Sequence, residues 1–139
     1  MEPSSPPEAI LCVDDEGIIL MHLLMLLKRR YGDRYRYERA SSAREGLAVV
    51  ERLEAEGVTL AILISDWLMP GISGDEFVRS LHRTRPGLRS ILVSGKSDEA
   101  EIRSLCAEAG LAGFLSKPIA SGDLFGLIDR IEAERHPGT

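Results

Sequence analysis

The chain alternates short apolar runs with longer amphipathic stretches between about residue 9 and residue 134. Five runs have the pattern of buried or half-buried strands, at residues 9–13, 35–40, 60–64, 91–93 and 113–115. The stretches that follow them predict helices over 17–30, from 42 to near 57, from 73 onward, over 98–109 and over 121–134. Five strand–helix units of this kind imply a parallel sheet with helices on both faces.

Local signals indicate where several of these elements begin and end. The first helix closes on the basic run 28–30 followed by Gly32, and both features favour a helix C-terminus. Ser42 with Glu45, and Ser73 with Glu76, have the three-residue spacing of a capping box and predict two helix starts. The run 35–40 alternates aromatic and charged residues, which predicts a half-exposed edge strand.

Length and charge set limits on the class of protein. With 139 residues, we expect one ordinary domain at 8–134, a disordered Pro/Ser-rich segment at 1–7 and a tail at 135–139. The net charge of −5 gives no basic surface for nucleic acid. The longest apolar run, 18–27, is too short for a span of about 20 residues, and no signal peptide precedes it. We therefore expect a cytoplasmic protein without membrane contact, whose cysteines are reduced core thiols.

Polar residues follow four of the five predicted strands directly. Asp14 and Asp15 follow the first strand, Asp66 the third, Ser94 the fourth and Lys117 the fifth. In an open parallel sheet, the carboxyl ends of the strands form the edge where ligands bind. A single carboxylate there is most simply a helix cap, but capping does not explain three acids, a hydroxyl and a lysine together.

This set of side chains suits phosphoryl transfer. Clustered carboxylates repel one another unless a cation joins them, and oxygen ligands of this kind suit Mg²⁺. The metal, a lysine and a hydroxyl would together neutralise a phosphoryl group carried on an aspartate. Asp66 is the best candidate nucleophile, because it ends a central strand and precedes the loop Pro70-Gly71.

These residues stand in an order and spacing that resemble a known signature. The string 13–16 (Val-Asp-Asp-Glu), the segment 65–71 with Gly74 beyond it, Ser94, and Lys117-Pro118 are similar to the receiver domain of two-component response regulators, including the chemotaxis regulator. The resemblance covers residues 8–134. It implies an α/β fold of the flavodoxin-like (βα)5 type, a doubly wound parallel sheet with strand order 2-1-3-4-5 in a single domain.

The resemblance also implies a metal site. Asp66 would be the phosphoacceptor, and Asp15 and Asp66 would bind Mg²⁺ (or Mn²⁺) through their side chains. Leu68 would contribute its backbone carbonyl, so that an apolar side chain is no obstacle at this position. Asp14 would hold the metal through water.

Further roles concern the phosphoryl group and the switch. Lys117 would pair with the phosphoryl group and form a cis peptide bond with Pro118. Ser94 would hydrogen-bond a phosphoryl oxygen and, with Phe114, act as a switch residue. The switch would shift the face built from the fourth and fifth helices and the fifth strand.

The implied function is signalling. The domain would take its phosphoryl group from a sensor histidine kinase or a histidine phosphotransfer protein and would catalyse only its own phosphorylation and dephosphorylation. It would then act on a downstream protein target or on an output domain absent from this chain. A stand-alone regulator and a fragment of a longer regulator or hybrid kinase both stay open, as does a homodimer.

Several positions depart from the usual pattern. Ser94 replaces the commoner threonine, and Gly95 stands where alanine is usual. Phe114 lacks the hydroxyl of the usual tyrosine, so it is either a switch that reports through its burial or a plain core residue. Leu68 and Lys96 occupy positions that tune the lifetime of the phosphoryl group in the family.

Three other functions compete with this interpretation. A haloacid-dehalogenase-type phosphatase requires an acid two residues after its nucleophile, where this chain has Leu68. A nucleotide- or flavin-binding module requires a glycine-rich phosphate loop, and none follows a predicted strand. A pseudo-receiver would lack one of the key residues, and all are present.

The first helix carries more apolar residues than one buried stripe needs, with nine among residues 18–27. It is either wedged between neighbouring elements or exposes a docking surface for a phosphotransfer partner or a second copy. Its methionines would make such a surface adaptable.

Overall fold

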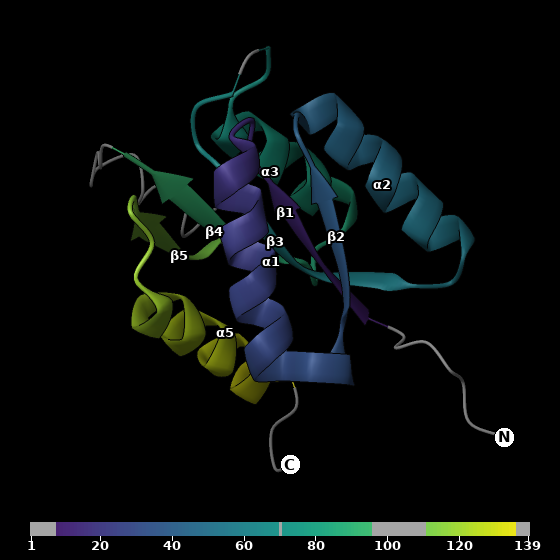
Figure 1. Ribbon diagram of the computed structural model, residues 1–139. Helices are drawn as coiled ribbons and strands as arrows, with labels where there is room; N and C mark the ends of the chain where they lie inside the picture. The colour runs from purple at the N-terminus through teal and green to yellow at the C-terminus, as the bar shows by residue number, and fades with distance from the viewer. Residues whose placement is uncertain (1–7, 70, 96–110, 136–139) are drawn as a thin grey trace, which may run out of the picture.

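The computed structural model describes residues 8–69, 71–95 and 111–135 (Figure 1). The strands are β1 (Glu8–Val13), β2 (Arg36–Ala40), β3 (Thr59–Asp66), β4 (Arg89–Ser94) and β5 (Leu111–Ser116). The helices are α1 (Gly17–Tyr31), α2 (Ala43–Ala55), α3 (Gly74–Thr84) and α5 (Ser121–Arg135), with a 3₁₀ turn η1 (Gly32–Arg34) after α1. The helix expected at 98–109 lies outside the described residues.

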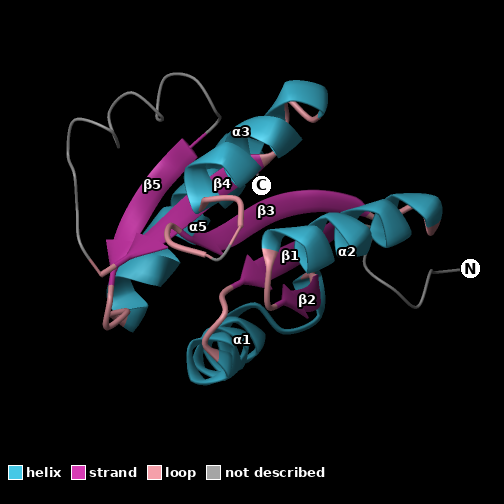
Figure 2. Ribbon diagram, turned by 90° about the horizontal axis from the view of Figure 1, so that it is seen from above, coloured by secondary structure: helices cyan, strands magenta, loops and turns pink. Residues whose placement is uncertain are grey.

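The strands form one parallel sheet in the order β2-β1-β3-β4-β5, which confirms the predicted topology. Helices α1 and α5 cover one face of the sheet, and α2 and α3 cover the other (Figure 2). Strand β2 lies at an edge and is only half-buried along most of its length, as its alternating sequence predicts. The central strands are buried on both faces, which explains their continuous apolar runs.

The two sides of the sheet have separate cores. In β1, Ile10 and Cys12 pack on the side of α1 and α5, while Leu11 and Val13 pack on the side of α2 and α3. The alternation follows from the strand period of two, which turns successive side chains to opposite faces. The carboxyl ends of β1, β3 and β4 are therefore packed from both faces of the sheet.

Two of the predicted helix boundaries are confirmed in atomic detail. Gly32 caps α1 with a φ of 54°, a conformation that favours glycine, and its amide donates to the carbonyl of Lys28. Ser42 begins α2, and its hydroxyl accepts a hydrogen bond of 3.1 Å from the amide of Glu45. The Glu45 carboxylate accepts from the amide of Ser41 at 2.8 Å, so the returning half of the capping box is displaced by one residue.

The capping box predicted at α3 is wrong in its chemistry, although the helix begins where expected. The Ser73 hydroxyl makes no bond to a backbone amide and contacts the Glu76 carboxylate at 3.3 Å instead. The amide of Gly74 donates to the carbonyl of Trp67 at 2.8 Å. The preceding loop therefore already supplies an acceptor to the start of this helix.

The apolar surplus of α1 lies on the surface. Leu20, Leu23 and Leu27 face the core, whereas Ile18, Met21 and Met25 keep 81%, 64% and 44% of their surface exposed. Since these side chains touch solvent, the wedged-helix alternative does not account for them. No helix in the described ranges is long and apolar enough to cross a membrane.

Candidate functional site

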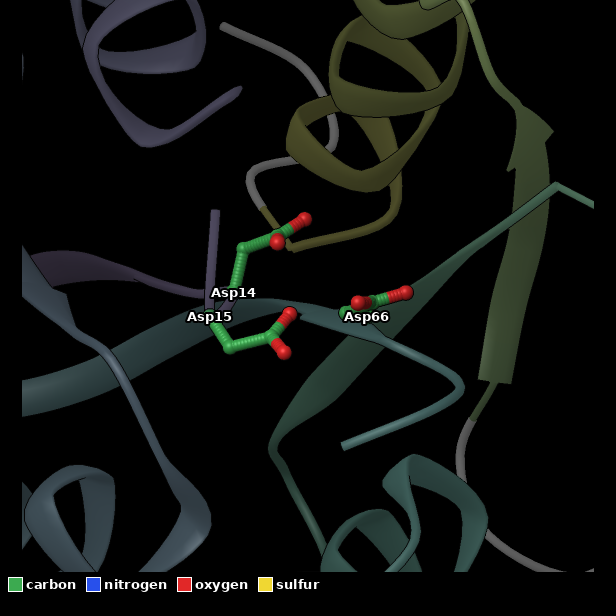
Figure 3. Close-up of side chains that lie close together, drawn as sticks. All are labelled: Asp14, Asp15 and Asp66. Carbon is green, nitrogen blue, oxygen red and sulfur yellow. The ribbon is translucent and has the colours of Figure 1, made fainter. Parts of the chain in front are cut away.

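The ends of β1 and β3 bring three carboxylates together. Val13 pairs with Ser65, so the residues that follow them, Asp14 and Asp66, lie side by side. One carboxylate oxygen from each of Asp14, Asp15 and Asp66 lies within 4.8 Å of the others (Figure 3). Asp14 and Asp66 are buried and Asp15 is exposed, so the cluster opens to solvent on one side.

The two oxygens of Asp14 have different environments. Oδ1 accepts a hydrogen bond of 2.8 Å from the amide of Glu16, a local bond between a side chain and the backbone two residues further on, and it does not cap α1, whose N-cap residue is Glu16. Oδ2 is buried and accepts no hydrogen bond within the described part of the chain, and its partner is the Lys117 ammonium at 3.2 Å. A metal ion that binds this buried oxygen would therefore have to share it with the Lys117 ammonium or displace the ammonium from it.

The Lys117 ammonium joins β5 to the acids of β1 and β3. Its Nζ lies 2.9 Å from Glu16 Oε1, 3.2 Å from Asp14 Oδ2 and 3.4 Å from Asp66 Oδ2. The sequence pattern predicted that Lys117, Asp14 and Asp66 lie at one edge of the sheet, but it did not predict these direct contacts and gave Glu16 no role. The only sequence signal for Glu16 is its place directly after the two aspartates.

The charges of the site are imperfectly balanced. Burial, and then the charge of Asp14, raise the pKa of Asp66, and the nearby Lys117 only partly opposes this shift. Burial likewise raises the pKa of Asp14. Burial alone would lower the pKa of Lys117, but the hydrogen bond to Glu16 and the charges of the aspartates raise it above its ordinary value. The lysine is therefore firmly charged, while the aspartates carry an excess of buried negative charge.

The start of α3 packs directly on the backbone of the central acid. The amide of Trp67 donates to the carbonyl of Val93 at 2.8 Å, which ties the loop after Asp66 to β4. A Cβ atom placed on Gly74 would lie 2.1 Å from the Asp66 carbonyl oxygen. Only glycine lets α3 begin this close to the site.

Comparison with known proteins decides the family. The family model described as the response regulator receiver domain matches residues 10–129. The chain belongs to this family. The matched range lies inside the domain predicted at 8–134, whose bounds stay a prediction.

Solved structures have the same fold as this receiver domain. The signal receiver domain of an HD domain-containing protein from Pseudomonas fluorescens Pf-5 is 27% identical with a TM-score of 0.78, over 94% of this chain and 98% of that chain. A CheY-like response regulator receiver domain protein from Methanospirillum hungatei JF-1 is 28% identical with a TM-score of 0.76, over the same shares of both chains.

Curated relatives are longer proteins. Sensor kinase CckA of Brucella abortus is 35% identical over 111 residues, which are 80% of this chain and 11% of CckA. The hydrogenase transcriptional regulatory protein HoxA of Cupriavidus necator is 29% identical over 115 residues, 83% of this chain and 22% of HoxA. This receiver domain thus spans a small part of each.

Membership settles the general function. Receiver domains are signalling modules of two-component systems, they interact with histidine kinases and their general function is to be phosphorylated on an aspartate. The phosphatase and the nucleotide-binding module are therefore not supported for this receiver domain.

Of the remaining predicted residues, Ser94 lies at the same edge of the sheet, whereas Phe114 lies within β5. Ser94 is buried at the end of β4, and its carbonyl accepts from the amide of Lys117 at 3.0 Å. The Lys117-Pro118 bond is cis, as expected. Phe114 is half-buried in β5 and packs against the core under α2 and α3, which agrees with the packing alternative. Its switch role and that of Ser94 stay predictions.

The donor set of this receiver domain fits a hard divalent cation. Receiver domains generally bind Mg²⁺, and three carboxylates, one of them with a buried oxygen free of hydrogen bonds in the described residues, are the ligands that Mg²⁺ prefers. Leu68, two residues after Asp66, is 69% exposed, and its carbonyl stays a predicted ligand. Lys96 lies outside the described residues.

Proposed function

We propose that Asp66 of this receiver domain accepts the phosphoryl group in a Mg²⁺-dependent reaction. The observation that carries the proposal is the burial of the Asp66 carboxylate beside Asp14 and Asp15, with the Lys117 ammonium 3.4 Å away. A buried acid in such company is held in place for reaction at one oxygen and is screened from bulk water.

In the proposed reaction, one carboxylate oxygen of Asp66 attacks the phosphorus atom of a phosphohistidine. The bond between phosphorus and the donor's imidazole nitrogen breaks, and its electron pair returns to that nitrogen. Lys117 neutralises charge on the transferred group, and the Ser94 hydroxyl donates a hydrogen bond to one of its oxygens. The Asp14, Asp15 and Asp66 carboxylates and the Leu68 carbonyl would hold Mg²⁺ (or Mn²⁺), which supplies positive charge to the phosphoryl oxygens when bound.

We propose that this reaction produces a signal and that no other substrate is turned over. The residue two positions after Asp66 is Leu68, whose exposed aliphatic side chain cannot serve a leaving group as an acid. The domain would catalyse only its own phosphorylation and dephosphorylation. The phosphorylated state would then alter the face formed by β5, α5 and the helix expected at 98–109 for a downstream protein or an output domain.

The phosphodonor would be a sensor histidine kinase or a histidine phosphotransfer protein. Helix α1 begins directly after the acids, and its exposed Ile18, Met21 and Met25 recur with helical spacing beside the site. An exposed apolar stripe of this kind suits a protein partner better than solvent. The free, buried thiol of Cys12 agrees with a reducing, cytoplasmic setting.

The test is incubation with acetyl phosphate, with and without Mg²⁺, followed by intact-mass measurement. The wild type should gain about 80 Da, the mass of one phosphoryl group, only when Mg²⁺ is present. Asp66→Asn should gain nothing, while the control Asp75→Asn, an acid of the first turn of α3, should be modified like the wild type.

Two outcomes would overturn the proposal. An adduct that survives in Asp66→Asn would assign the phosphoryl group to another residue. A wild type that gains no mass and also fails to form a beryllofluoride complex would point to a pure interaction domain.

A further inference from the structure

Lys117 has a partner that the phosphoryl-transfer chemistry does not require. Its ammonium can donate three hydrogen bonds, and in this structure three carboxylates surround it. The shortest of the three contacts, 2.9 Å, is to Glu16, which has no place among the predicted metal ligands. The Glu16 side chain is 62% exposed, whereas those of Asp14 and Asp66 are only 1% and 7% exposed.

Glu16 therefore attracts the Lys117 ammonium toward the solvent-exposed side of the cluster. Lys117 and a divalent cation compete for the same oxygens, because the ammonium already contacts Asp14 Oδ2 and Asp66 Oδ2. A positive charge seated on those oxygens repels an incoming cation. Because Glu16 lies at the exposed rim of the site, Lys117 can leave the Asp14 and Asp66 oxygens and still be paired with a carboxylate.

We propose that Glu16 is a positioning residue that holds Lys117 at the rim of the site while Mg²⁺ takes the oxygens of Asp14 and Asp66. The inference rests on the proposed Mg²⁺ site. The contact joins residues 101 positions apart, so Glu16 also links the start of α1 to the end of β5 at the mouth of the site.

The inference predicts weaker Mg²⁺ binding when the Glu16 carboxylate is removed. In Glu16→Gln, the ammonium settles on Asp14 and Asp66, and the dissociation constant for Mg²⁺ should rise about two- to fivefold, the effect of one exposed ion pair. Mg²⁺ can be titrated by the emission of Trp67, the only tryptophan and the neighbour of Asp66, and independently by amide chemical shifts.

A double-mutant cycle with Lys117 separates positioning from simple charge. If Glu16 acts through Lys117, Glu16→Gln should lose most of its effect in a Lys117→Met background. Glu76→Gln is the matched control, because it removes one exposed acid from the first turn of α3, where the carboxylate contacts Ser73 and not Lys117. It should leave the Mg²⁺ affinity close to that of the wild type.

The outcomes separate this inference from the proposed function. Wild type that binds Mg²⁺ together with Glu16→Gln of equal affinity overturns the inference alone. An equal fold-change in the wild-type and Lys117→Met backgrounds also overturns it, because the effect would then not pass through the lysine. Wild type that binds no Mg²⁺ overturns both the metal site and the role of Glu16.

Discussion

Replacing Gly74 with alanine tests how closely the start of α3 must approach the phosphoacceptor. The added Cβ would lie 2.1 Å from the Asp66 carbonyl oxygen and 2.9 Å from the Trp67 Cα, and both neighbours are backbone atoms that no rotamer change can move. Real Cβ atoms essentially never approach within 3.0 Å, so α3 and the end of β3 must separate by about 0.9 Å.

The cost of this separation has two parts. Crowding of backbone in a packed interior destabilises by about 1–3 kcal/mol. The hydrogen bond of 2.8 Å from the Gly74 amide to the Trp67 carbonyl would lengthen beyond the usual range, at about 0.5–1.5 kcal/mol. We therefore expect Gly74→Ala to lower the free energy of unfolding by about 2–4 kcal/mol and to slow phosphorylation by acetyl phosphate, because the Asp66 backbone is displaced.

Urea unfolding and the mass assay would measure the two effects. The matched control is Gly126→Ala in α5, where a Cβ meets nothing within 4 Å and alanine should stabilise the helix by about 0.5–1 kcal/mol. A Gly74→Ala protein as stable as the wild type, or as reactive, would refute the argument that close backbone approach requires glycine here.

Further predictions concern charge, the α1–α5 contact and the partner surface. Without Mg²⁺, Asp66→Asn should stabilise the fold at neutral pH, because burial and the charge of Asp14 raise the pKa of Asp66, so that its charged form opposes folding. This gain in the free energy of unfolding should vanish below about pH 4, where the carboxyl is protonated in the folded and the unfolded state. Urea unfolding at several values between about pH 3 and 7 would measure the gain, and a gain that does not change with pH would contradict the charge argument. Tyr31→Phe should cost about 0.5–1.5 kcal/mol in the same assay, since it removes the 2.8 Å hydrogen bond to Asp129 on α5, and an unchanged unfolding midpoint would count against this contact. Met21 is 64% exposed, so Met21→Lys should change the free energy of unfolding by less than about 0.5 kcal/mol and leave phosphorylation by acetyl phosphate intact. It should slow phosphoryl transfer from a histidine donor. Equal transfer rates for Met21→Lys and the wild type would show that this face of α1 is not part of the docking surface.

The sequence was sufficient for the sheet and for the acids of the site, because both depend on local patterns. Apolar runs of strand length predicted four strands, and the alternation of aromatic and charged residues predicted the edge strand β2. The residues after the strands had to meet at one edge once the sheet was parallel. Ser42 could be recognised as a cap because the bond to Glu45 spans only three residues. The same reasoning erred at Ser73, whose side chain contacts the Glu76 carboxylate and caps no amide, while the Gly74 amide at the start of the helix donates to the Trp67 carbonyl.

Contacts between distant side chains could not be predicted in this way. The hydrogen bond of Tyr31 to Asp129 and the contact of Lys117 with Glu16 join residues 98 and 101 positions apart. Such pairs depend on helix rotation and side-chain reach, which a hydrophobic period fixes only roughly. For the same reason, the composition of α1 showed a surplus of apolar residues but not which of them face solvent.

The charges of the site suggest how the signal begins. Three aspartates, Glu16 and one lysine sum to −3, which a divalent cation would reduce to −1, and phosphorylation of Asp66 would then exchange one negative charge for nearly two. If Asp66 is phosphorylated as proposed, the new charge would attract Lys117 away from Glu16 and toward the phosphoryl group. The Lys117 amide donates to the Ser94 carbonyl at 3.0 Å, and Lys117 directly follows β5, so a movement of Lys117 would act on the ends of β4 and β5 together. We therefore expect this lysine to connect the proposed phosphorylation site to the strand that carries Phe114.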